Sequence, residues 1–107
     1  MNTKIVRVRD FTTLPGARHR GDGDGSADEF FEDYVLPSLN PVMKDKTGQL
    51  LIDLDGTLGY ASSFVSQLAV RVKNEFESRR AVKKKIIIKS DDDRSQEERF
   101  WDAIKQN

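Results

Sequence analysis

The sequence contains no cysteine and only one histidine, His19. The absence of cysteine excludes disulfide bonds and thiolate metal sites, and a single histidine excludes a zinc site built from several imidazoles. We therefore expect neither a resident metal ion nor a cofactor.

The chain also lacks long apolar runs and an excess of charge of either sign. No apolar segment approaches the roughly 20 residues that a membrane-spanning helix requires, and the first ten residues lack the apolar stretch of a secretory signal. Lys plus Arg number 18, as do Asp plus Glu, so the composition gives no general attraction to nucleic acid or to an anionic membrane. These features predict a cytoplasmic protein that contacts no membrane and is not built to bind nucleic acid.

The periodicity of apolar residues predicts three strands. Apolar and basic residues alternate over 4–11, residues 49–55 are largely apolar and suit a central strand, and residues 83–89 form a β-branched run with basic ends. Residues 12–25 hold four glycines and a proline, which predicts a long loop. At 107 residues, we expect one domain over 1–107.

Helical patterns alternate with these strands. Ser26 and Glu29 match a capping box that begins a helix, which Pro37 should break near Leu36, with a continuation to about Lys44. Apolar residues recur at helical spacing after the second strand and again near the end of the chain; they are Phe64, Val65, Leu68, Ala69, Val72, Phe76, Phe100, Trp101 and Ile104. The predicted order is β-α-β-α-β-α, which defines an α/β domain with a small mixed sheet and helices packed on it.

One candidate site is catalytic. Asp53-Leu54-Asp55-Gly56-Thr57 follows a strand and resembles the nucleophile motif of haloacid-dehalogenase-like phosphohydrolases. Because residues two apart on a strand face the same way, Asp53 can attack phosphorus while Asp55 moves a proton beside magnesium. About half of the chain precedes the motif, however, and no strand-borne serine or threonine follows in a suitable place. The alternative is that these aspartates end a strand and shape an Asp-Gly turn, so we do not expect an enzyme.

A second resemblance covers roughly residues 4 to 106. The stretches DFTTLPGARHRGDGDGSADEFFEDYVLPSL, LLIDLDGTLGYASSF and KKKIIIK, followed by a terminal helix, resemble the bacterial STAS-like domain family of unknown function. That family is related to the STAS domains of anti-sigma factor antagonists. The most specific pieces are the Pro-Gly-x-Arg loop and Gly-Tyr-x-Ser-Ser-Phe, which ends at Phe64.

The resemblance implies a single STAS-like domain with a regulatory, non-enzymatic role and a protein partner. Antagonists of this kind are phosphorylated by a histidine-kinase-type ATPase on a serine at the start of a helix, which here corresponds to Ser62 or Ser63. Ala61 and Phe64 stand where those antagonists carry aspartate and glycine. Independently, the amides and dipole of a helix start favour an anion such as phosphate. The simpler alternative is that one of these serines only caps the helix.

Two basic segments complete the set of candidates. Arg18 and Arg20, in the glycine-rich loop, are predicted to close over an anion or a partner at the Ser62–Ser63 helix start, together with Gly59 and Tyr60. A nucleotide or another anion is therefore an alternative ligand. The run Arg79–Lys85 has five basic residues but no interleaved aromatic residue, so we interpret it as a solvated helix end rather than a nucleic-acid surface.

Overall fold

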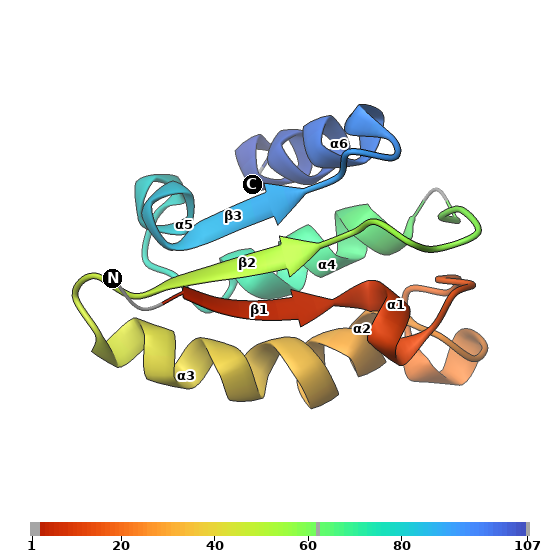
Figure 1. Cartoon of the computed structure of the whole chain (residues 1–107), viewed down its shortest axis with the longest axis horizontal. Helices are drawn as coiled ribbons and strands as arrows, with labels where there is room; N and C mark the ends of the chain where they lie inside the picture. The colour runs from red at the N-terminus through yellow and green to blue at the C-terminus, as the bar shows by residue number, and fades with distance from the viewer. Residues whose placement is uncertain (1–2, 62, 107) are drawn as a thin grey trace.

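The computed structural model describes residues 3–61 and 63–106, which form a mixed α/β domain around a three-stranded sheet (Figure 1). The strands are β1 (Thr3–Arg7), β2 (Gln49–Asp53) and β3 (Ile86–Lys89), arranged in the order β1-β2-β3. The predicted central position of the second strand is confirmed. Both strand pairs are parallel, so the prediction of a mixed sheet is wrong. A helical crossover between successive strands returns the chain to the same end of the sheet, and the next strand therefore runs in the same direction.

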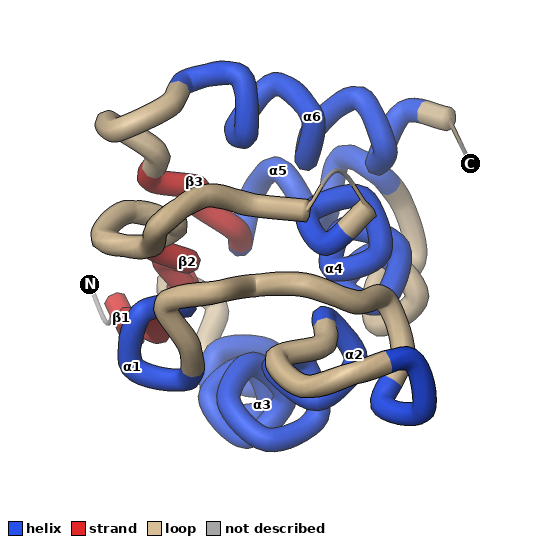
Figure 2. Tube along the Cα trace, turned by 90° about the vertical axis from the view of Figure 1, so that its right-hand side faces the viewer, coloured by secondary structure: helices blue, strands red, loops and turns tan. Residues whose placement is uncertain are grey.

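The helices cover one face of the sheet. Looking along the strands, Figure 2 shows α3, α4 and α6 gathered on one side. The inward residues of the central strand, Leu50 and Ile52, are buried beneath them. On the opposite face Ile5, Leu51 and Ile87 lie in register across the three strands. Ile5 is 48% exposed there, so this face is open in the single chain.

The first long helical segment runs without a break from Ala27 to Lys44. It consists of α2 (Ala27–Phe30), a wider π-turn labelled η2 (Phe31–Val35) and α3 (Leu36–Lys44). Pro37 lies in the first turn of α3. A proline lacks an amide hydrogen and its ring clashes with the carbonyl group four residues earlier, so a widened turn just before it relieves the clash. The predicted break at Leu36 is therefore a change of helical pitch, and the predicted end near Lys44 is confirmed.

The capping prediction at the start of this segment is confirmed. Ser26 is fully buried, and its Oγ accepts a hydrogen bond of 3.1 Å from the amide of Glu29. The remaining helices are α1 (Val8–Phe11), η1 (Arg20–Asp22), α4 (Phe64–Lys73), α5 (Arg79–Lys85) and α6 (Arg94–Lys105). None of the helices in the described ranges is long and apolar enough to cross a membrane.

Two predicted strands are shorter than expected because helices take their place. The first strand ends at Arg7, and α1 then turns Val8 and Phe11 toward the core. The third strand begins at Ile86 rather than at residue 83, because residues 83–85 belong to the helix α5. The Oγ of Ser78 caps α5 by accepting from the amide of Ala81 at 3.1 Å. Arginine and lysine are good helix formers, so the basic run is helical up to the β-branched residues.

An aromatic cluster joins the helices at the carboxyl end of the sheet. The Phe30 ring lies with its centroid 5.7 Å from that of Phe11, 5.6 Å from that of Tyr34 and 6.3 Å from that of Phe64. Tyr60 adds a further ring, 5.6 Å from Phe64. The cluster therefore fixes the start of α4 and the loop before it against α2.

Candidate functional site

The two aspartates of the predicted catalytic motif lie at the carboxyl end of the central strand, β2. Asp53 ends β2, and its side chain is only 6% exposed. One carboxylate oxygen accepts from the amide of Asp55 at 2.9 Å, and the other accepts from Nη1 of Arg9 at 3.0 Å. Nε of Arg7 lies 3.8 Å from the latter oxygen. Asp53 thus ties the end of β2 to the end of β1.

Asp55 makes the corresponding connection to β3. One of its oxygens accepts from the amide of Asp92 at 2.9 Å, and the other accepts from Nζ of Lys89 at 2.6 Å. Burial alone would raise the pKa of Asp55, but the Asp92 amide and the Lys89 ammonium more than offset it and hold that pKa below its ordinary value. Hydrogen bonds to Asp55 and then Asp91 raise the pKa of Lys89 to about 12.

These contacts give each of the four carboxylate oxygens of Asp53 and Asp55 a partner within the chain. The network therefore joins the ends of the three strands, which is a structural role. Within residues 3–61 and 63–106, no group of three or more acidic, histidine or cysteine side chains is arranged to hold a metal ion.

The loop that follows, residues 56–61, lies against the beginning of the glycine-rich loop. The amide of Leu58 donates to the carbonyl oxygen of Thr13 at 2.8 Å, and the amide of Ala61 donates to that of Pro15 at 3.1 Å. Gly56 has a φ of 84°, a conformation that favours glycine, and a Cβ there would lie 2.6 Å from Cδ of Arg9. Two loops distant in the sequence are thus joined at one end of the sheet, where Figure 2 shows them side by side.

The paired loops expose two large apolar side chains. Leu58 is 80% exposed and Leu14 is 66% exposed, although the backbone on each loop is held by the hydrogen bonds just described. Sequence reasoning did not single out either leucine. The available signal was a lone leucine among glycines, threonines and a proline in each loop.

Tyr60, predicted to lie in a partner or anion loop, faces partly inward. Its hydroxyl donates to the carbonyl oxygen of Leu54 at 2.6 Å, and burial raises the pKa of the phenol. It also lines a cavity of about 220 Å³ at the strand ends, together with Leu54, Asp55, Thr57, Leu58, Gly59, Ser90, Asp92, Asp93 and Gln96. Gly59 is exposed and has a φ of 130°. Tyr60 thus anchors the loop, and Gly59 lets it turn.

The predicted switch residues are Ser62 and Ser63, and Ser62 lies outside the described residues. Ser63 immediately precedes α4 and is half-buried. Its φ of −96° and ψ of −10° are helical values, and its side chain makes no capping hydrogen bond. For Ser63, the alternative that it only caps the helix is therefore wrong.

The two basic residues predicted to bind an anion, Arg18 and Arg20, have different surroundings in the structure. Arg20 pairs with Glu32 at 2.8 Å and with Asp33 at 3.0 Å, so it is held on the α2–η2 segment rather than at the start of α4. Arg18 is exposed, and its carbonyl oxygen accepts from the amide of Asp28 at 3.0 Å. Among the residues the structure describes, no carboxylate forms an ion pair with Arg18.

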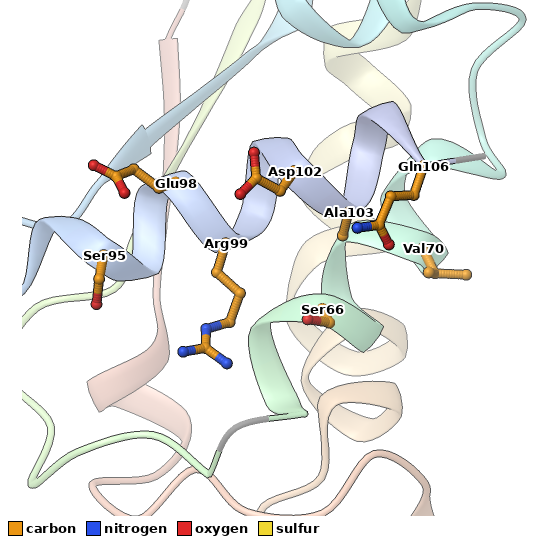
Figure 3. Close-up of a pocket in the computed structure, with 8 residues that line it drawn as sticks. All are labelled: Ser66, Val70, Ser95, Glu98, Arg99, Asp102, Ala103 and Gln106. Atoms are coloured by element: carbon orange, nitrogen blue, oxygen red, sulfur yellow. The ribbon is translucent and has the colours of Figure 1, made fainter.

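A different arginine extends toward the start of α4. Figure 3 shows the Arg99 side chain leaving α6 and pointing toward the first turn of α4, where Ser66 lies. Both residues line an open groove of about 470 Å³ between α4 and α6. Sequence reasoning missed Arg99 because it treated the last helix only through its apolar face.

No family model, curated protein or solved structure matches the chain. The functional assignment therefore depends on these residues and their geometry.

Proposed function

We propose that the chain is a non-enzymatic, STAS-like regulatory module that binds a protein partner through the paired loops at the carboxyl end of the sheet. The observation that carries the proposal is the exposure of Leu58 and Leu14 on two loops joined by backbone hydrogen bonds. Apolar side chains held in place on an ordered backbone bind with little loss of conformational entropy. The resemblance of Gly59–Phe64 to the switch segment of STAS domains adds a histidine-kinase-type ATPase as the class of partner.

The beginning of α4 supplies the regulatory part of the proposal. The Ser63 side chain makes no capping bond, and the helix it precedes is ten residues long with a buried apolar face. A phosphate on Ser63 would meet the amides of the helix start and the nearby Arg99 guanidinium. The added charge of about −1.5 to −2 would change the affinity of the adjacent loop surface for its partner.

The partner surface is tested by placing a charge on Leu58. In affinity purification of the tagged full chain from its source organism, Leu58→Arg should reduce the recovered partner at least about tenfold, because an apolar contact would then bury an unpaired charge. Met43→Arg is the matched control, since Met43 is also exposed, at 42%, but lies on α3. Equal recovery with wild type and Leu58→Arg would exclude this surface.

The switch is tested with the same purified partner. Ser62→Asp and Ser63→Asp should each shift its affinity, whereas the double alanine variant should bind but not respond to the kinase. If all three variants bind as wild type does and none differs in its response, the module has no serine switch.

A second candidate function has a specific observation in its favour. Asp53, Asp55 and Lys89 meet at the ends of adjacent parallel strands, which is where α/β enzymes place their chemistry. A minimal magnesium-dependent phosphatase would release phosphate from an aryl phosphate in wild type and lose that activity in Asp53→Asn. Because the four carboxylate oxygens are already bonded, we expect both proteins to stay at background.

A further inference from the structure

The molecule carries a charged surface at the opposite end of the sheet from the paired loops. Arg79, Arg80, Lys83 and Lys84 are all exposed on α5. Their spacing of i, i+1, i+4 and i+5 places them on one face of the helix, while Val82 is buried on the other. Among the described residues, no carboxylate forms an ion pair with any of these four side chains.

Further cations converge on the same end. Nζ of Lys85 donates to the carbonyl oxygen of Val42 at 3.2 Å and also to that of Asp45. This contact brings the end of α5 against the end of α3, where Lys44 and Lys46 are exposed. Figure 1 shows α5, the turn after α3 and the beginning of β1 together at one end of the molecule.

The arrangement is unfavourable for the isolated helix. Like charges four residues apart, as in Arg79 with Lys83 and Arg80 with Lys84, repel one another. Two arginines also occupy the first turn, which contains no acidic residue, although the amino end of a helix favours negative charge. Elsewhere in the described chain the cations Arg9, Arg20, Arg71 and Lys89 have carboxylate partners. Helix propensity and the lysines of the last turn favour α5, but neither accounts for the two arginines in its first turn.

Folding also separates charges that balance in the sequence. The chain has a net charge of zero, but Asp91, Asp92 and Asp93 lie beyond the carboxyl end of β3, whereas α5 lies before its amino end. Asp45, Glu75 and Glu77 lie beside these cations in the sequence, but the cations of α5 with Lys44 and Lys46 outnumber them. That end of the molecule is therefore basic despite the neutral composition. The zero net charge argued against nucleic acid because it averages over both ends. The missing aromatic residues argue against stacking on unpaired bases, but contacts with the backbone of a duplex need only charge.

We infer that the basic end, formed by the exposed face of α5 with Lys44 and Lys46, binds the phosphate backbone of nucleic acid. The α5 face exposes no large apolar or aromatic side chain among its four cations. Apolar residues on the bound face strengthen attachment to a membrane, and buried aromatic anchors stabilise many protein interfaces, so their absence favours a partner recognised by its charge. A phosphate backbone is bound by charge alone, so the interaction is independent of base sequence and depends strongly on salt.

The test is fluorescence anisotropy of a fluorescein-labelled, mixed-sequence DNA duplex titrated with the full chain at low salt. Wild type should raise the anisotropy, and K83Q/K84Q should weaken binding about tenfold and reduce the salt slope by about 2, since each lost phosphate contact removes about 0.9. The matched control R94Q/K105Q removes two exposed charges on α6 and should bind as wild type does. R79Q/R80Q serves as a second variant on α5, and circular dichroism melts check that each variant is folded.

Absence of an anisotropy change with wild type would overturn the inference, as would an equal loss of affinity in K83Q/K84Q and R94Q/K105Q. Sedimentation with phosphatidylserine vesicles provides the remaining arm. Vesicle binding without duplex binding would assign the surface to membranes instead. Because the basic end and the Leu58 loop lie at opposite ends of the sheet, each result is independent of the partner-capture experiment.

Discussion

Replacing Asp55 with alanine should lower the free energy of unfolding by about 3 kcal/mol. The substitution removes the acceptor of the Asp92 amide and the carboxylate partner of Lys89. A hydrogen bond to a charged group contributes about 1.5–3 kcal/mol, and leaving the part-buried Asp92 amide unpaired adds to the loss. Urea unfolding followed by circular dichroism measures the effect. Asp91→Ala is the matched control, because the 71% exposed Asp91 side chain pairs with the same lysine and should cost about 0–1 kcal/mol.

The same network predicts the acid side of the stability curve. Because the pKa of Asp55 is lower in the folded chain than its ordinary value, the folded state binds fewer protons there. Its contribution is present above the unfolded-state pKa of about 4 and is lost as the pH falls through the lower folded-state value. The difference in stability between wild type and Asp55→Ala should therefore shrink below about pH 4. A difference that stays constant from pH 7 to pH 3 would show that the charge on Asp55 does not stabilise the fold.

Replacing Phe30 with alanine should have a still larger effect, about 3–5 kcal/mol. Phe30 is fully buried, and its ring lies among those of Phe11, Tyr34 and Phe64. The substitution leaves a cavity beneath the start of α4 and removes several ring contacts. A domain of this size has about 5–15 kcal/mol of stability in total, so thermal unfolding should begin well below the wild-type transition.

Two controls separate packing from mere loss of apolar surface. Phe30→Leu, which fills most of the cavity, should cost about 1–2 kcal/mol. Leu58→Ala should change the stability by less than about 0.5 kcal/mol, because the side chain is 80% exposed. A large loss in Leu58→Ala would mean that the leucine stabilises the fold and is not held out for a partner.

Periodicity in the sequence predicted the main alternation of elements because each pattern reports a local fact. The largely apolar run over 49–55 marks the buried central strand β2, and the capping box at Ser26 requires only residues three apart. The same local patterns failed at 83–85, where lysines suit a helix as well as a strand edge. The choice there depends on Ser78 capping the helix and on Val82 reaching the core.

The candidate site was less predictable because its contacts are distant in the sequence. The pairing of Asp53 with Arg9 joins residues that are 44 positions apart, and that of Asp55 with Lys89 joins residues 34 apart. No local pattern indicates which arginine points toward the start of α4, and the structure favours Arg99 over the predicted Arg20. Likewise, the exposure of Leu58 follows from hydrogen bonds with the loop around Thr13, which is visible only in the folded chain.

The most direct test of the proposed interaction module is site-specific photo-crosslinking from position 58. A benzophenone amino acid in place of Leu58, in the full chain expressed in its source organism, should give a light-dependent adduct with a protein partner identified by mass spectrometry. The same amino acid in place of Met43, on α3, should not give that adduct. If position 58 gives no adduct, or if both positions give the same one, the paired loops are not the surface through which this protein acts.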